Sequence, residues 1–380
     1  MNRYKFLSYI NRFKDAIAIA VLLFVCYCLY CLPSAYNGLV TNIPAVITSA
    51  YGVLLMYFLG RKISSKKYGL ISALILASGF EYIYISSCCA ADMLFSVCTA
   101  SSVFAGLYTL FCSYGHRRFF WWSAYIFAGC AFILKGIGGI IIPVLTLGIS
   151  CFIAGQFKNL FKPLYFVPGI IMFAATLFIK HPVSHQYNFQ MFYKFLPLFL
   201  AGFMPWTFSL FAQIFVYLKK SLKDTKTYIE KFSEMQPIIQ FMTVNTVFIC
   251  VVFFTAFILG AKSSAYLLPA MFPASMMIGK FWFDYLFKDE NERAVNISTL
   301  LLNLVLALSA AVILFVSFYV ISFNTFLPVI FAIFVLLFAA LNALFIFKDK
   351  KLLHFMSFVL FMIVFTAVAV RFLIPSYVHI

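Results

Sequence analysis

The sequence predicts an all-α, polytopic membrane protein with about thirteen membrane-spanning helices. Of its 380 residues, 64% are hydrophobic and only 10% are charged, whereas a soluble domain carries about 25% charged residues. The apolar runs are about 18–25 residues long, which suits helices that cross a bilayer. They lack the strict alternation of a membrane β-barrel strand. Helices also satisfy their own backbone hydrogen bonds in lipid.

The expected spans are separated by short polar segments, so we predict a single transmembrane domain over residues 1–380. Residues 1–15 form its N-terminal segment, and residues 297–374 contribute its C-terminal helices. The spans are expected at residues 16–33, 39–60, 68–86, 90–112, 119–134, 138–155, 161–179, 192–218, 238–259, 264–287, 297–321, 325–347 and 352–374.

The basic residues predict the orientation of these spans. A net charge of +17 would suit nucleic-acid binding if it were gathered on one surface, but here it is divided into small clusters that flank apolar runs. If the N-terminus is cytoplasmic and the spans alternate, most of the 28 lysine and arginine residues face the cytoplasm. This is the positive-inside pattern. We therefore predict a multi-pass protein of the cytoplasmic (inner) membrane, with a cytoplasmic N-terminus, an uncleaved first span and no nucleic-acid partner.

Ionisable residues at the outer ends of the spans are the candidate functional groups, because such groups are costly in a membrane and usually have a partner or a function. Among the acidic residues, Glu81 and Asp92 alone are expected in the outer half, on either side of the turn between the third and fourth spans. Five cations are expected at the outer ends: Lys135, Lys180, Lys194, Lys262 and Arg371. Cations in this position suit an anionic lipid headgroup, such as a phosphate or diphosphate linked to a polyprenol. A nearby carboxylate can orient or deprotonate an acceptor hydroxyl, or hold a divalent metal.

Structural explanations compete with these functional ones. Asp92 can pair with a lysine or cap the fourth helix, and Glu81 can be a buried carboxylate that is protonated or paired. Lys180 and Lys194 can extend to the membrane interface. These alternatives stay open from the sequence.

Other polar or reactive residues give a weaker signal. His181 and His185 flank a short outer segment, but two histidines without a nearby carboxylate favour a polar loop over a metal site. The ten cysteines lie in or at the ends of apolar runs, where they serve as small side chains compatible with lipid. These histidines and cysteines therefore predict no metal site of their own, and a divalent metal held by an outer carboxylate stays open as a possible cofactor.

Five short motifs follow one another along the chain. They are Gly60-Arg61 before a basic inner loop, Asp92 at the outer start of the fourth span, Lys135-Gly136 followed by Pro143, Tyr193 to Pro197 followed by Pro205-Trp206, and Lys262-Ser-Ser-Ala-Tyr266-Leu-Leu-Pro269. Together they resemble motifs of the polyprenyl-phosphate-sugar-dependent glycosyltransferases of the GT-C superfamily, in particular glycosyltransferase family 39 and the bacterial lipid A aminoarabinose transferases. The resemblance covers residues 40–275.

This resemblance implies a GT-C-like scaffold and a reaction outside the cytoplasm. A polyprenyl-phosphate-linked sugar would be the donor, and a lipid, glycan or protein would be the acceptor. Lys135, Lys262 and Tyr266 would bind the lipid phosphate, and Asp92 or Glu81 would supply the catalytic carboxylate.

The chain also departs from the family pattern. The family carries a catalytic acidic residue on a long first outer loop, whereas residues 33–38 form a short outer segment without a carboxylate. The outer segment at residues 180–191 is short as well. Two alternatives follow: a catalytically inactive relative that binds a polyprenyl-phosphate lipid or a partner protein, and a transporter of lipids or solutes. The sugar, the acceptor and the oligomeric state are not specified by the sequence.

Overall fold

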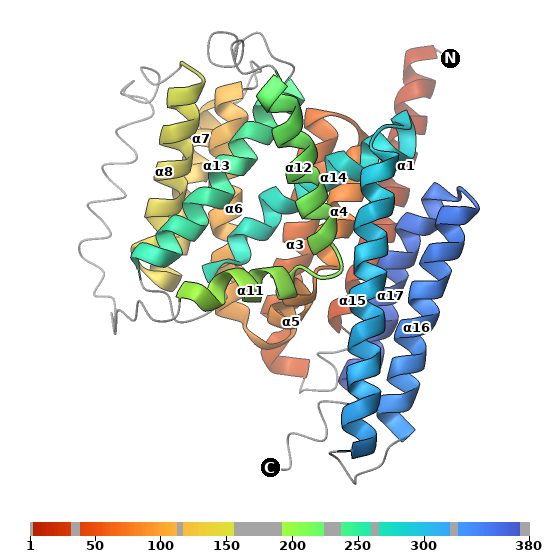
Figure 1. Cartoon of the computed structure of the whole chain (residues 1–380). Helices are drawn as coiled ribbons and strands as arrows, with labels where there is room; N and C mark the ends of the chain where they lie inside the picture. Colours follow the sequence, from red (N-terminus) through yellow and green to blue (C-terminus); the bar gives the residue numbers. More distant parts are fainter. Residues whose placement is uncertain are drawn as a thin grey trace.

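The computed structural model describes residues 3–31, 39–111, 117–155, 192–223, 237–259, 266–319 and 326–372. These residues form a helical bundle without strands (Figure 1). The longer helices are α1 (Arg3–Cys26), α3 (Leu39–Ile63), α6 (Ala90–Phe111), α7 (Arg117–Lys135), α8 (Gly138–Ile153), α13 (Pro237–Ile258), α14 (Met271–Lys288), α15 (Glu292–Tyr319), α16 (Phe326–Phe347) and α17 (Lys351–Phe372). The remaining elements are η1 (Tyr27–Cys31), α4 (Lys66–Ala77), α5 (Phe80–Cys88), α11 (Phe192–Gly202), α12 (Thr207–Lys223) and η5 (Leu268–Ala270).

The multi-pass membrane architecture and the all-α class are confirmed. Within the described residues, five helices are long and apolar enough to cross a membrane, or up to seven if each of two bent helix pairs counts as one span. Three shorter apolar helices lie within α7, α8 and α17. The count of about thirteen spans stays a prediction, and the expected span at residues 161–179 lies outside the described residues.

Two expected spans are broken helices rather than continuous ones. The third is divided into α4 and α5, which meet at an angle of 63°, and the eighth is divided into α11 and α12, which meet at 111°. Small residues, Ser78 and Gly79, occupy the first break. Pro205, which has no N–H to continue a helix, lies in the second. The apolar composition continues across both breaks, so hydropathy alone predicted uninterrupted spans.

The breaks lie against each other and exchange hydrogen bonds. The backbone N–H of Phe80 donates to the carbonyl oxygen of Met204 at 3.2 Å, and the indole N–H of Trp206 donates to the Ser78 hydroxyl at 2.9 Å. The Tyr30 hydroxyl donates to the carbonyl oxygen of Ala77 at 3.0 Å. Backbone groups that leave the helical pattern in an apolar setting need such partners.

Close backbone contact joins the end of α3 to the start of α4. A Cβ added to Gly60 would lie 2.7 Å from Gly69 Cα, and one added to Gly69 would lie 2.4 Å from the Tyr57 carbonyl oxygen. Membrane helices approach closely through small residues of this kind. α14 packs against helices α3 and α4, and most of the α14 side chains are buried. Figure 1 shows α15, α16 and α17 as a layer along one side of the bundle.

Ion pairs concentrate at the end of the bundle where α1 begins, which we call the basic end. There Asp15 contacts Lys66 at 2.9 Å and Arg61 at 3.1 Å, and it accepts a hydrogen bond from the Tyr57 hydroxyl at 2.8 Å. Partial burial raises the pKa of Asp15, but the hydrogen bonds and the two cations outweigh it, so the pKa lies below its usual value. Lys351 pairs with Asp289 at 2.6 Å at the same end. The sequence predicts that this end is cytoplasmic.

Candidate functional site

The turn between α7 and α8 positions Lys135 at the end opposite the basic end. Lys135 is the last residue of α7, and Gly136 follows it with a φ of 70°, a left-handed conformation that closes helices. α8 then begins at Gly138 and packs directly on α7, because a Cβ added to Gly139 would lie 2.4 Å from the backbone carbon of Ala131. The Lys-Gly-x-Gly-Gly sequence therefore holds the lysine at a tight, well-defined corner.

Asp92 lies in the first turn of α6 and forms an ion pair with Lys135. Its carboxylate oxygen is 2.5 Å from the lysine Nζ, and the Asp92 and Lys135 side chains are 23% and 12% exposed. Of the alternatives left open by the sequence, pairing with a lysine is the arrangement that the structure shows. The pair is partly screened from solvent. It therefore places a hydrogen-bond acceptor, the Asp92 carboxylate, beside a donor, the Lys135 ammonium group, at a partly desolvated surface.

Two aromatic rings complete this cluster. The Lys135 Nζ lies 4.5 Å from the ring centre of Tyr266 and 5.5 Å from that of Phe95. The two ring centres are 5.6 Å apart. The Tyr266 hydroxyl donates to the Lys135 carbonyl oxygen at 3.4 Å. Cation–π contacts of this kind orient an ammonium group without neutralising its charge.

Phe95 is the member of this cluster that the sequence interpretation missed. It follows Asp92 by three residues, and residues at that spacing lie on the same face of a helix. A search for aromatic residues one turn from each candidate carboxylate would have found it. We refer to Asp92, Phe95, Lys135 and Tyr266 as the Lys135 cluster.

Glu81 lies at the junction of the two helix breaks, and its contacts differ from those of Asp92. It is in the first turn of α5 and is buried, with 6% of its surface exposed. It packs against the end of α11, because a Cβ added to Gly202 would lie 2.5 Å from the Glu81 Oε2 atom. The sequence placed Glu81 near the end of a continuous span, whereas in the structure it begins a new helix.

Several other candidates cannot be placed. Lys262, Lys180, His181 and His185 lie outside the described residues, as do the side chains of Lys194 and Arg371. Within the described parts of the chain, no group of three or more histidine, cysteine, aspartate or glutamate residues could hold a metal ion.

Comparison with solved structures identifies the scaffold. The chain is similar to ArnT from Cupriavidus metallidurans in a crystal structure bound to undecaprenyl phosphate, with a TM-score of 0.61, 16% sequence identity, and coverage of 87% of this chain and 63% of that chain. The apo crystal structure of the same protein gives a TM-score of 0.59 at 15% identity, covering 87% and 62%. The chain has a GT-C-like fold.

The similarity lies in the fold rather than in the sequence. No family model matches the chain, and no curated protein matches it by sequence. The chain spans 63% of the length of the ArnT structure. The GT-C-like scaffold expected from the five motifs is thus confirmed. The similarity concerns the fold alone and does not specify an activity.

Proposed function

We propose that the chain is a membrane glycosyltransferase that moves a sugar from a polyprenyl-phosphate donor to an acceptor hydroxyl outside the cytoplasm. One observation carries the proposal: Lys135, Asp92 and Tyr266 gather at the end of the bundle opposite the basic end. The fold is shared with a protein that has been crystallised with undecaprenyl phosphate. The acceptor would be a lipid, a glycan or a protein.

Lys135 is proposed to bind the phosphate of the donor. An ammonium group has three donors, so it can contact a phosphate oxygen while it remains beside Asp92. When the bond between the anomeric carbon and the phosphate oxygen breaks, the leaving polyprenyl phosphate gains negative charge. A nearby cation in a partly dry site stabilises that charge. Lys262 is proposed to add a second positive charge to this phosphate.

Asp92 is proposed to act on the acceptor. The acceptor oxygen attacks the anomeric carbon, the electron pair of the broken bond leaves with the phosphate, and the hydroxyl proton passes to the Asp92 carboxylate. Glu81 is the second candidate for this base, because it is the other carboxylate expected at the outer end. No step in this scheme is assigned to a metal ion.

A transfer assay in membranes tests the proposal, with radiolabelled polyprenyl-phosphate sugars as donors. Asp92→Asn and Lys135→Met are expected to abolish transfer. The matched control is the pair Asp289→Asn and Lys351→Gln, which removes an ion pair of similar length, 2.6 Å, at the basic end and should leave transfer intact. Transfer that survives in a chain carrying both Asp92→Asn and Glu81→Gln would refute the assignment of the base.

A second candidate is a catalytically inactive protein that binds a polyprenyl-phosphate lipid. The ion pair itself favours it, because a carboxylate held 2.5 Å from a lysine is already engaged. This candidate predicts undecaprenyl phosphate binding that depends on Lys135, with no turnover of any donor. Sugar transfer by the purified protein would exclude it.

The broken helices invite comparison with transporters, in which unwound segments form substrate sites. Here the break at residues 203–206 is filled by apolar packing: Trp206 and Phe203 are fully buried. Trp206 stacks on Phe358 at 5.0 Å between ring centres and meets Trp282 edge to face at 5.9 Å. This packing favours a structural role for the break.

A further inference from the structure

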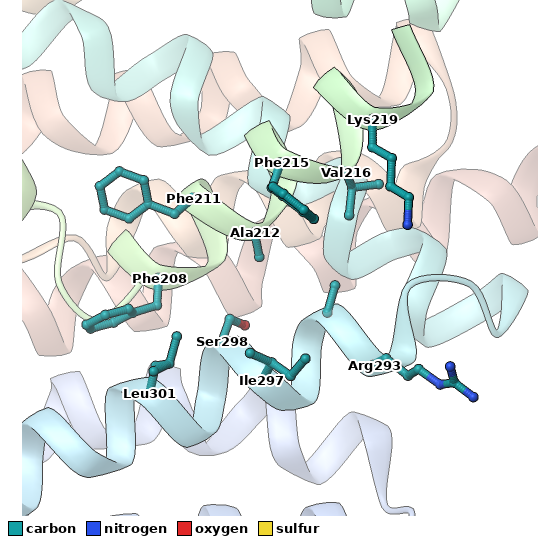
Figure 2. Close-up of a pocket in the computed structure, with 11 residues that line it drawn as sticks. Phe208, Phe211, Ala212, Phe215, Val216, Lys219, Arg293, Ile297, Ser298 and Leu301 are labelled. Carbon is teal, nitrogen blue, oxygen red and sulfur yellow. The ribbon is translucent and has the colours of Figure 1, made fainter. Parts of the chain in front are cut away.

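A cavity of about 700 Å³ lies between α12 and α15, away from the Lys135 cluster (Figure 2). Its walls are mostly apolar and include Phe211 and Phe215 from α12 and Ile297 and Leu301 from α15. Phe215 and Ile297 are 68% and 58% exposed. The cavity therefore opens to the outside of the bundle, where a membrane protein meets lipid.

Two basic residues line the same end of this cavity, Lys219 on the α12 wall and Arg293 on the α15 wall, as Figure 2 shows. Lys219 is near the end of α12, and Arg293 is the second residue of α15. Neither forms an ion pair with another described residue. Some other cations at the basic end are paired: Lys280 and Lys288 both contact Asp284, and Lys351 contacts Asp289. The cavity thus joins an apolar wall to positive charge that the described residues leave uncompensated.

The length of the cavity matches one leaflet of a bilayer. Phe208 lines one end and Lys219 the other, and the stretch of α12 between them rises by about 16 Å. The hydrocarbon core of a bilayer is about 30 Å thick, so one leaflet is about 15 Å deep. An acyl chain that entered between the helices would run along Phe208, Phe211 and Phe215 while its headgroup reached the two cations.

We propose that this cavity binds an anionic phospholipid from the leaflet at the basic end. Its phosphate contacts Lys219 and Arg293, and one acyl chain occupies the apolar groove between α12 and α15. Positive charge at the lipid–water boundary attracts anionic lipids, and basic pockets between membrane helices hold their headgroups. The site differs from the Lys135 cluster in position, leaflet and residues, so it does not depend on the proposed glycosyltransferase activity.

Native mass spectrometry of the full chain tests this proposal. The protein is purified with an equal mixture of palmitoyl-oleoyl phosphatidylglycerol and phosphatidylcholine, and the retained lipids are counted. The unmodified chain is expected to retain phosphatidylglycerol preferentially, and Lys219→Glu with Arg293→Glu is expected to reduce that retention at least tenfold. The matched control, Lys348→Glu with Lys350→Glu, reverses the same number of charges at exposed positions of the basic end and should retain the lipid.

Two further measurements separate a lipid from a soluble anion and from misfolding. Ala212→Trp fills the groove and leaves both cations in place, so it should also release phosphatidylglycerol, and its thermal unfolding reports whether it folds. Inorganic phosphate in large excess should not displace the lipid from the unmodified chain. Equal retention in the charge-reversed and control variants, retention that survives Ala212→Trp, or displacement by inorganic phosphate would each overturn the proposal.

Discussion

Substitutions of the two members of the Asp92–Lys135 pair are expected to change the affinity for a polyprenyl-phosphate lipid in opposite directions. Lys135→Met removes the proposed charge-assisted contact to the donor phosphate, a loss of about 1.5–3 kcal/mol. The affinity for undecaprenyl phosphate should therefore fall by about 10- to 150-fold. Methionine keeps most of the apolar contact that the lysine chain makes with Phe95 and Tyr266, so the comparison isolates the charge.

Asp92→Asn should instead tighten binding of the same lipid. A carboxylate that sits 2.5 Å from Lys135 lies about 5 Å from any phosphate on that lysine, and two like charges at that distance repel by about 3 kcal/mol at an effective dielectric constant of about 20. Because the Asp92 side chain is 23% exposed, screening reduces this repulsion, to about 1.4 kcal/mol, or about tenfold in affinity. The same variant should lose transfer.

Titration of undecaprenyl phosphate into the purified variants in detergent measures both effects, with thermal unfolding as the folding control. If Asp92→Asn weakens binding as Lys135→Met does, the carboxylate serves mainly to hold the lysine in place. That result would refute the reasoning that gives the two residues separate tasks. If neither substitution changes affinity, the Lys135 cluster is not the lipid site.

Three further outcomes follow from the structure. Gly202→Ala should lower the stability by about 1–3 kcal/mol, because its Cβ would lie 2.5 Å from Glu81; Gly148→Ala, with nothing within 4 Å of the new Cβ, is the control in thermal unfolding. Tyr266→Leu should weaken lipid binding through loss of the cation–π contact, about 0.5–2 kcal/mol, whereas Tyr266→Phe keeps the ring and should bind nearly as well. The pKa of Asp15 is lowered in the folded chain, so ionised Asp15 stabilises the fold at a pH above its unfolded pKa, and this stabilisation disappears as the pH falls through its folded pKa. The free energy of unfolding measured against pH should show this loss of stability in the native chain and not in Asp15→Asn.

Helix positions were largely predictable where an apolar run ends in polar residues. The expected spans at residues 90–112 and 138–155 correspond to α6 and α8, which end within two residues of the prediction. Length and composition suffice there, because the membrane sets both. The breaks in the third and eighth spans were not predicted, since they depend on a contact between Ser78 and Trp206, which are 128 residues apart.

Most residues of the Lys135 cluster could be named from the sequence, but the contacts between them could not. The cost of a charge in a membrane singled out Asp92, Glu81 and Lys135. This cost does not show that Lys135 forms an ion pair with Asp92 or that Glu81 packs against Gly202. Both contacts depend on how α5, α6, α7 and α11 are arranged in space. The resemblance to the GT-C glycosyltransferases rested on the order of the motifs along the chain, whereas the distances between their side chains came from the structure.

The lengths of the helices have a consequence for the surrounding lipid. α8 has 16 residues and α15 has 28, so they rise by about 24 Å and about 42 Å, against a hydrocarbon core of about 30 Å. Hydrophobic mismatch of this kind thins the bilayer around the short helix and tilts the long one. Because α8 begins beside Lys135, we expect this thinning to bring lipid phosphates closer to the depth of the Lys135 cluster. We expect bilayer thickness, which is set by acyl-chain length, to influence access of the proposed lipid-linked donor to this end of the bundle.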